Sequence, residues 1–208
     1  MARWSAVERS LRANGARLIA GVDEVGRGPL AGPVFACALI MPPDARAIAG
    51  VEDSKKLAPA ERERLALKIR EKAVTLALGA ASVREIAELN IYQATALAMR
   101  RALGRLREHP DVVLVDGKPI KTLGVPHQAF VGGDRRIYVI ACASIVAKVA
   151  RDRLMRSLAA RHPGYGWEAN AGYGTPVHMQ ALRSQGVTAH HRALFCRGVL
   201  GEAGAGAG

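Results

Sequence analysis

The stretch IAGVDEVGRGPLAGPV, residues 19–34, starts as an apolar run, reaches two adjacent acids and then enters a loop of glycines and prolines. The apolar run is typical of a buried β-strand, and the glycines and prolines end it. Asp23 and Glu24 therefore stand at the end of a strand. Two adjacent acids there are unexpected, because the chain carries a formal net charge of +12.

The chain has 208 residues, and 30 Lys or Arg outweigh 18 Asp or Glu. Its length and its 50% of hydrophobic residues are typical of one globular domain, which we predict over residues 1–200, with a flexible Gly/Ala tail over residues 201–208. The basic excess favours a polyanionic partner such as nucleic acid. A genome that favours Arg and Ala would give the same bias, and charge alone leaves both explanations open.

Cysteine usage and hydropathy indicate where such a protein works. Cys37, Cys142 and Cys196 are odd in number and lack C-x-x-C spacing, which argues against a zinc site or a disulfide framework and favours a reducing compartment. The N-terminus has no apolar signal-peptide core, and no window reaches the length of a membrane helix. We expect a cytoplasmic protein outside the membrane.

Hydrophobic patterns predict alternating strands and helices along the chain. ARLIAGVDEVG and GPVFACALIM are expected to pair as strands, followed by a helix from near Pro59 and a third strand at VTLALGAASV. A helical stretch over residues 84–106, breaking near Asn90, precedes two strands, DVVLVDG and HQAFVGGD. A long helix over residues 137–161 and a short one over residues 176–184 complete the order. This order favours a mixed α/β sheet with helices on its faces.

Three of the predicted strands end in acids, at Asp23–Glu24, Asp116 and Asp134. Strand ends at one edge of an α/β sheet collect functional groups. Clustered carboxylates stay ionised together only if a cation neutralises them, and oxygen-only ligands suit Mg²⁺ or Mn²⁺ rather than zinc. In a basic protein, a pair of such ions points to phosphodiester hydrolysis.

Two objections to this metal hypothesis come from the residues themselves. Any one acid taken alone is better explained as a cap of an element or as the partner of an arginine. Neighbours on a strand also point to opposite faces, so Asp23 and Glu24 reach one site only if the strand ends or bulges there.

Seven ordered segments resemble the ribonuclease HII family, the type 2 ribonucleases H that nick the RNA strand of RNA/DNA hybrids and single ribonucleotides embedded in DNA. They are GVDEVGRGPLAGPV, DSKKL, NIYQATALAMRRAL, VLVDG, GGD, ASIVAKVARD and GYGTPVHMQALRSQGVTAHHRALF. The resemblance covers residues 19–195. It implies a ribonuclease H-like α/β fold, with a five-stranded mixed sheet of three antiparallel and then two parallel strands, flanked by helices, and a helical C-terminal part.

The resemblance also implies roles for individual residues. The catalytic, metal-binding acids that it implies are Asp23, Glu24, Asp116 and Asp134, with Mg²⁺ or Mn²⁺ as cofactor. The implied substrate-binding residues are the ribose-reading loop Gly26, Arg27 and Gly28, the junction-sensing Tyr173, and the phosphate contacts Ser54, Lys55, Lys56, Lys148 and Arg151. Without the resemblance, Lys55 and Lys56 are more typical of a solvated charge pair and Tyr173 of a surface aromatic. Lys148 and Arg151 are then open to a helix-surface ion network.

Other features of the C-terminal half are weighed separately. We interpret His178, His190 and His191 mainly as structural hydrogen bonders. The sequence departs from the family pattern at Gly132, where the family usually has Lys, and at the two arginines that follow Asp134 directly.

The implied reaction is attack by a metal-activated water on the phosphorus 5′ of a ribonucleotide, leaving 5′-phosphate and 3′-hydroxyl ends. The implied partner is an RNA/DNA hybrid or a DNA duplex that contains ribonucleotides. We expect a monomer, and recruitment by a replication clamp stays open. Two alternatives remain. A junction resolvase of the same fold would lack the ribose-reading loop and Tyr173. A non-catalytic nucleic-acid-binding protein would be expected to avoid acids at its centre.

Overall fold

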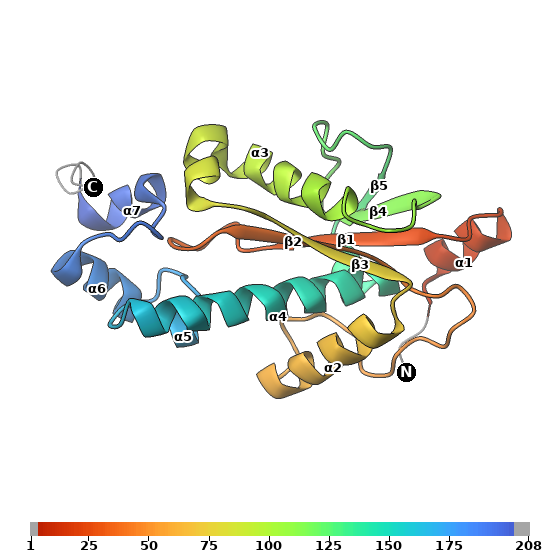
Figure 1. The fold of residues 1–208 in the computed structure, drawn as a ribbon, viewed down its shortest axis with the longest axis horizontal. Coiled ribbons are helices and arrows are strands. Elements are labelled where there is room, and N and C mark those ends of the chain that lie inside the picture. Colours follow the sequence, from red (N-terminus) through yellow and green to blue (C-terminus); the bar gives the residue numbers. More distant parts are fainter. Residues whose placement is uncertain (1–3, 202–208) are drawn as a thin grey trace.

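A five-stranded sheet lies at the centre of the computed structural model, which describes residues 4–201, and its strand order is β3-β2-β1-β4-β5 (Figure 1). The strands are β1 (Ile19–Val25), β2 (Val34–Ile40), β3 (Thr75–Ala81), β4 (Val112–Asp116) and β5 (Gln128–Phe130). β2 runs antiparallel to both β1 and β3, and β4 runs parallel to both β1 and β5. The predicted mixed sheet of three antiparallel and two parallel strands is confirmed.

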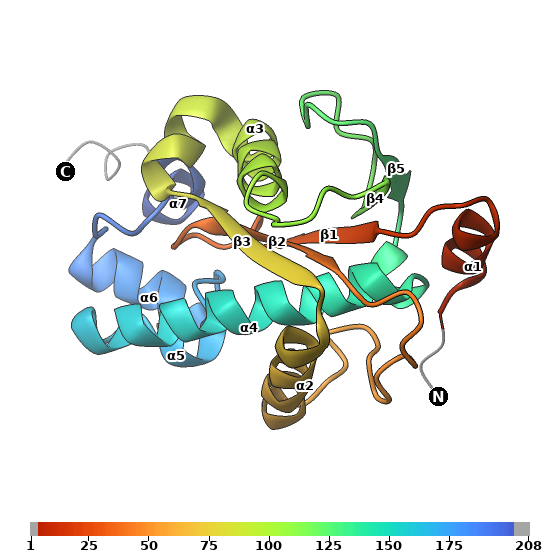
Figure 2. The same ribbon diagram turned by 45° about the vertical axis from the view of Figure 1, so that its right-hand side comes forward.

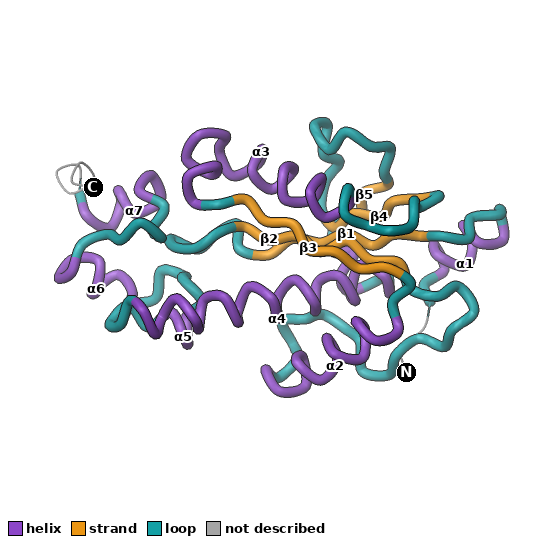
Figure 3. Tube along the Cα trace, viewed as in Figure 1, coloured by secondary structure: helices purple, strands orange, loops and turns teal. Residues whose placement is uncertain are grey.

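Helices cover both faces of this sheet (Figures 1 and 3). The three long ones are α2 (Pro59–Lys72), α3 (Val83–Leu103) and α4 (Tyr138–Arg161). α3 lies on one face, and α4 with α2 lies on the other. One hydrophobic core fills the space between the sheet and α3, and a second fills the space between the sheet, α4 and α2. Burial on both sides explains why the central strands read as nearly continuous apolar runs.

Side chains of β1 alternate between these two cores. Ala20 and Val22 enter the core beneath α3, whereas Ile19 enters the core beneath α4. Continued along the strand, this alternation turns Asp23 toward α4 and Glu24 toward α3. The two adjacent acids therefore begin on opposite faces of the sheet.

The short helix α1 (Ala6–Ala13) fixes the start of α4. Its buried residue Glu8 accepts hydrogen bonds from the backbone N–H groups of Tyr138 and Val139, at 3.2 and 3.0 Å. The first N–H groups of a helix have no partner within it, and a carboxylate satisfies both their hydrogen bonding and the helix dipole. This contact holds in place the helix that follows Asp134.

The C-terminal part is helical, as predicted, and packs around the end of α4 that extends beyond the sheet (Figure 2). Its helices are α5 (Trp167–Asn170), α6 (Pro176–Gln185) and α7 (Ala193–Leu200). A third hydrophobic cluster, which includes Met155, Trp167, Leu182 and Cys196, joins them to α4. The two ends of α4 therefore serve different purposes, one in the sheet core and one in the C-terminal part.

Asn90 breaks α3, as predicted from the sequence. Its φ of 68° lies in the left-handed region, and its side-chain oxygen accepts hydrogen bonds from the N–H groups of Tyr92 and Gln93. The asparagine side chain caps the helical segment that follows, and these hydrogen bonds support a backbone conformation that is uncommon for a residue other than glycine.

The fifth strand does not end at Asp134, which corrects the prediction made from HQAFVGGD. β5 ends at Phe130, and Asp134 lies in a single 3₁₀ turn, η1 (Gly133–Arg135), directly before α4. Gly132 has φ of 67°, so the chain leaves the strand direction there in a left-handed conformation that glycine adopts readily.

Two further expectations concern the surroundings and the tail. Within residues 4–201, none of the helices is both long and apolar enough to pass through a lipid bilayer. The predicted flexible tail falls almost wholly on residues 202–208, which lie outside the described residues.

Candidate active site

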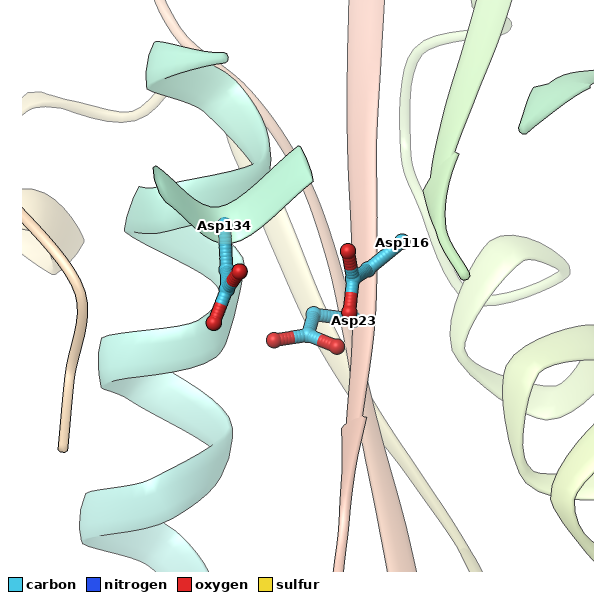
Figure 4. A group of neighbouring side chains, drawn as sticks. All are labelled: Asp23, Asp116 and Asp134. Carbon is cyan, nitrogen blue, oxygen red and sulfur yellow. The ribbon is translucent and has the colours of Figure 1, made fainter. Parts of the chain in front are cut away.

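Asp23 and Asp116 meet because β1 and β4 are parallel neighbours in register. Val22 lies opposite Val115, so one residue further along both strands the two acids stand side by side on the face turned toward α4. Their carboxylates approach each other at the carboxyl ends of these strands (Figure 4).

Asp134 completes the group from the 3₁₀ turn. The N–H of Gly133 donates a hydrogen bond of 2.6 Å to Oδ1 of Asp116, which ties the turn to the end of β4. One carboxylate oxygen of each of Asp23, Asp116 and Asp134 lies within 4.8 Å of the others (Figure 4). Acids from three separate segments thus form one acidic triad, which contains three of the four acids expected from the sequence.

Burial and mutual repulsion dominate the electrostatics of this triad. Burial raises the pKa of Asp23 well above its usual value, and the charges of Glu24 and Asp116 raise it further. Burial is also the main reason that the pKa of Asp134 is raised, followed by the charge of Asp116, while Lys55 acts in the opposite direction. A bound cation would relieve both the desolvation and the repulsion.

Glu24 stands at the rim of the group. It is not one of the three acids within 4.8 Å of each other, but it lines the same cavity of about 320 Å³ as the triad. Its carboxylate accepts a hydrogen bond from Arg27 at 3.3 Å. Burial raises the pKa of Glu24, and Arg27 opposes this increase. Adjacent strand residues point to opposite faces, and Glu24 accordingly lies outside the triad that contains Asp23. Metal ligation by Glu24 stays a prediction.

The donors present fit a hard divalent cation. Three carboxylates from rigid elements converge, every candidate ligand atom is oxygen, and the pKa of two of the acids is raised by burial and by neighbouring acids. Oxygen ligands of this charge suit Mg²⁺ or Mn²⁺, and no cysteine or histidine belongs to the group found within residues 4–201.

The cavity above the triad collects predicted residues from distant parts of the chain. Ser54, Lys55, Lys148 and Tyr173 all line it. Lys55 is exposed, and its Nζ lies 3.9 Å from a carboxylate oxygen of Asp134. These residues come from the loop before α2, from α4 and from the segment between α5 and α6, so only the fold brings them together.

Three of the predicted phosphate contacts are placed differently from one another. The buried hydroxyl of Ser54 is hydrogen-bonded to that of Ser144 at 3.0 Å, so Ser54 belongs to the wall of the cavity rather than to its exposed surface. Lys56 is exposed but does not line the cavity. Lys148 pairs with Asp152 at 2.8 Å, as the ion-network interpretation predicts, and it also lines the cavity, where a phosphate contact stays a prediction.

Arg151 does not reach the surface, which corrects the expectation of a phosphate contact. Its side chain is fully buried, and its guanidinium donates hydrogen bonds to the backbone carbonyls of Ala31, Pro33 and Ala171 at 2.9 to 3.0 Å. A Cβ at Gly26 would collide with it. Spacing on a helix surface could not reveal this, because the loops that bury Arg151 come from elsewhere in the chain.

The Gly26–Gly28 loop directly follows Glu24 and Val25, which line the cavity. Arg27 is half exposed and pairs with Glu24, and Gly28 faces the exposed ring of Tyr173, with 3.8 Å between a Cβ built at Gly28 and Cε1 of the tyrosine. The loop and the tyrosine are therefore neighbours across a narrow gap beside the acids.

Sequence reasoning missed two residues near the site. Ser144 lines the cavity and lowers the pKa of Asp23 against the effect of burial. Its position one helical turn before Lys148 on an otherwise apolar helix face was the available signal. Arg192 is buried against the backbone of the Gly26–Gly28 loop. Only its place in the HHRALF segment hinted at a structural role.

Two of the three histidines, His178 and His191, are structural hydrogen bonders as interpreted, whereas the ring of His190 lies against those of His162 and Trp167. His178 and His191 are buried, and their Nε2 atoms lie 3.0 Å apart in one hydrogen-bond network. Burial is the main reason that the pKa of His191 is lowered to about 4, which keeps it neutral near pH 7.

Comparison with known proteins shows the family of this chain. The family described as Ribonuclease HII matches residues 20–198. Ribonuclease HII of Paracoccus denitrificans is 56% identical over 194 residues, covering 92% of this chain and 90% of that protein. Ribonuclease HII of Thermosynechococcus vestitus is 52% identical over 183 residues, covering 88% and 85%. The crystal structure of ribonuclease H2 from Pyrococcus horikoshii is similar with a TM-score of 0.75 at 27% identity, covering 89% of this chain and 98% of that one. With its mixed sheet and convergent acids, this chain belongs to the ribonuclease HII family and is a ribonuclease H, a nuclease that hydrolyses RNA in hybrids.

Proposed function

We propose that this ribonuclease H cleaves the RNA strand of RNA/DNA hybrids and nicks duplex DNA on the 5′ side of embedded ribonucleotides, with Asp23, Glu24, Asp116 and Asp134 as its catalytic acids. The observation that carries the proposal is the acidic triad in a cavity that Tyr173 also lines, with Gly28 beside the tyrosine ring. Residues 1–200 would act as one catalytic domain.

The four acids would hold Mg²⁺ or Mn²⁺. Bound there, such ions supply a nucleophilic water and stabilise the leaving 3′-oxygen. The protein itself supplies position: three of the four acids lie on the paired strands β1 and β4, and Asp134 lies on a turn that is hydrogen-bonded to Asp116. Rigid placement lowers the reorganisation needed in the transition state. The chain therefore needs no nucleophilic side chain.

Ribose recognition would come from the rim of the cavity. Glycines at Gly26 and Gly28 let backbone groups approach a 2′-hydroxyl, the group that distinguishes RNA from DNA. The ring of Tyr173, 44% exposed beside Gly28, is available to pack against the deoxyribose that follows a ribonucleotide. Together the loop and the tyrosine would select a ribonucleotide that is followed by a deoxyribonucleotide.

Phosphate contacts would come from the lysines in and beside the cavity of the acids. Lys55 and Lys148 line the cavity, and the exposed Lys56 extends this basic edge beside Lys55. Their attraction for the backbone carries no sequence preference and weakens as salt rises. Ser54 would support this loop from within the wall.

The test uses a labelled DNA duplex with one ribonucleotide, incubated with Mg²⁺ or Mn²⁺ beside all-DNA and all-RNA duplexes, a long hybrid, a branched DNA and an EDTA control. We expect metal-dependent nicking 5′ of the ribonucleotide and cleavage of the long hybrid. Cleavage of the branched DNA instead would favour the junction resolvase, and binding without cleavage would favour a non-catalytic protein.

The assembly and the compartment remain part of the proposal. We propose a monomer of the cytoplasm that binds its duplex without a partner subunit. The three cysteines are free and buried, which agrees with a reducing compartment. Light scattering of the purified protein would reveal any dimer, and pull-down with a replication clamp would test recruitment.

A further inference from the structure

The segment around His191 lies against the ribose-reading loop although the two are far apart in the chain. The N–H of Gly32 donates to the carbonyl of His190, and the N–H of Arg192 donates to the carbonyl of Leu30, both at 2.8 Å. Ala31 and His191 form an isolated antiparallel β-bridge between these bonds. The C-terminal segment is therefore anchored directly to the loop that follows the first two acids.

Arg192 directs its whole side chain into that loop. Its guanidinium donates hydrogen bonds to the carbonyls of Gly26 at 2.6 Å, Arg27 at 2.8 Å and Gly32 at 2.9 Å. The residue is 2% exposed, and within residues 4–201 its guanidinium makes no salt bridge with a carboxylate. A buried cation without a counter-ion is costly unless hydrogen bonds compensate it, and here those bonds all go to one loop.

His191 reaches the second ribose-facing element through His178. Nδ1 of His178 lies 2.9 Å from the carbonyl oxygen of Tyr173, which only accepts, so this nitrogen carries the proton. Nε2 of His178 then accepts from Trp167 at 3.1 Å and from Nε2 of His191 at 3.0 Å. Nδ1 of His191 accepts from the N–H of Thr188 at 2.8 Å. The partners thus assign one neutral tautomer to each histidine, and the chain of bonds ends at Tyr173.

We infer that His191 and Arg192 are positioning residues for ribose recognition, with Arg192 fixing the backbone of the Gly26–Gly28 loop and His191 fixing the carbonyl of Tyr173 through His178. The inference rests on the proposed function, because it takes the loop and the tyrosine as the ribose-facing groups. Neither positioning residue lines the cavity of the acids, so each acts through another group.

Binding measurements without metal separate this role from a general effect on stability. The dissociation constant is measured in EDTA for a duplex with one ribonucleotide and for the matching all-DNA duplex, and the preference is their ratio. A loss of folded protein changes both constants equally and leaves the ratio unchanged. In Arg192→Gln we expect the preference to fall about tenfold, or about 1.4 kcal/mol. Arg192→Lys should retain part of it, since lysine keeps the charge but lacks the planar fork.

Leu182→Ala is the matched control. Leu182 is fully buried in the hydrophobic cluster that joins the C-terminal helices to α4. Its side chain has no polar atom and takes no part in the hydrogen bonds of Arg192 and His191. Its truncation should lower stability and leave the preference unchanged. If Arg192→Gln does not fold, amide hydrogen exchange of Arg192→Lys provides the test. Exchange over residues 26–32 should then be faster in this variant than in the wild type.

His191→Phe tests the second arm. It keeps an aromatic ring in the buried position and removes the hydrogen bond to His178. We compare kcat/KM for the single-ribonucleotide duplex with kcat/KM for a long hybrid. We expect the ratio of the two to fall about threefold, which is at the low end of the contribution of one hydrogen bond.

The outcomes separate the two levels of the proposal. A wild-type protein without preference for the ribonucleotide would overturn ribose reading itself. A wild-type preference that persists in Arg192→Gln, or in Arg192→Lys with unchanged exchange over residues 26–32, would overturn the role of Arg192 alone. An unchanged kcat/KM ratio in His191→Phe would do the same for His191.

Discussion

The backbone N–H of Gly133 donates a hydrogen bond of 2.6 Å to Oδ1 of Asp116, which fastens the turn that carries Asp134 to the end of β4. The scaffold, rather than any attraction between the acids, therefore holds like charges together. Asp23 is fixed in a similar way, since its Oδ1 accepts the N–H of Glu24 at 2.7 Å.

Asp116→Asn should abolish cleavage, with a loss of about 10³-fold or more, while largely keeping the affinity for duplex in EDTA. The amide oxygen still accepts the bond from Gly133, so the turn stays in place and only the ligand charge is lost. Glu88→Gln, an exposed acid on α3, serves as the control and should cleave normally. Retained cleavage in Asp116→Asn would refute its role as a metal ligand.

Asp23→Asn should make the metal-free protein more stable at pH 8, raising Tm by a few degrees, about 1 kcal/mol. The reason is that burial and the neighbouring acids disfavour the charged form of Asp23 and raise its pKa. Mg²⁺ should raise the Tm of the wild type by mass action and have little effect on the variant. Thermal unfolding with Mg²⁺ and with EDTA measures both, and equal Mg²⁺ shifts would contradict the metal site.

Tyr173→Ala should weaken cleavage at isolated ribonucleotides more than on long hybrids, because only the former present a deoxyribose to the ring. Tyr173→Phe keeps the ring and should keep the preference. Val177→Ala, an exposed position on the following helix, controls for surface changes. Paired kcat/KM values on the two substrates give the answer, and an equal loss on both would count against junction sensing.

Acid should destabilise the histidine cluster. Burial, followed by the charges of His178, His162 and His190, lowers the pKa of His191 to about 4, below the ordinary value of 6.5. Between these values the unfolded chain binds a proton that the native state does not. The stabilising contribution is therefore complete above pH 6.5 and is lost as pH falls toward 4, by up to about 3 kcal/mol.

Urea unfolding of wild type and His191→Phe between pH 7.5 and pH 4.5 tests this prediction. The difference between the two proteins removes the contribution of the acids, which both share. The wild type should lose stability more steeply as the pH falls. Parallel curves would show that His191 is not held neutral.

Gly21→Ala should destabilise the protein by roughly 3 kcal/mol or more, because its Cβ would lie 2.3 Å from the backbone carbonyl of Val139, where β1 and α4 are packed together. Gly198→Ala is the matched control in α7, where the added methyl meets nothing within 4 Å. It should gain about 0.5–1 kcal/mol from helix propensity. Chemical denaturation of both variants measures the difference, and similar stabilities would contradict the close approach.

The order of strands and helices could be predicted because each depends on local patterns. Apolar runs marked the buried strands, and Asn90 marked the break in α3. The fifth strand was predicted too long, since the conformation of Gly132 and the packing of η1 before α4 depend on distant contacts. The acids Asp23 and Asp116 could be predicted as neighbours, because parallel strands bring their carboxyl ends to one edge.

The sequence by itself determined the order of strands and helices, the strand-end acids Asp23 and Asp116, and the family. The tertiary structure alone decided which side chains face the site: Glu24 lies at the rim outside the triad, Arg151 is buried, and Arg192 supports the Gly26–Gly28 loop. The physical reason is that strand and helix patterns follow from neighbours in the chain. The burial and hydrogen-bond partners of a charged side chain depend instead on segments that meet only after folding.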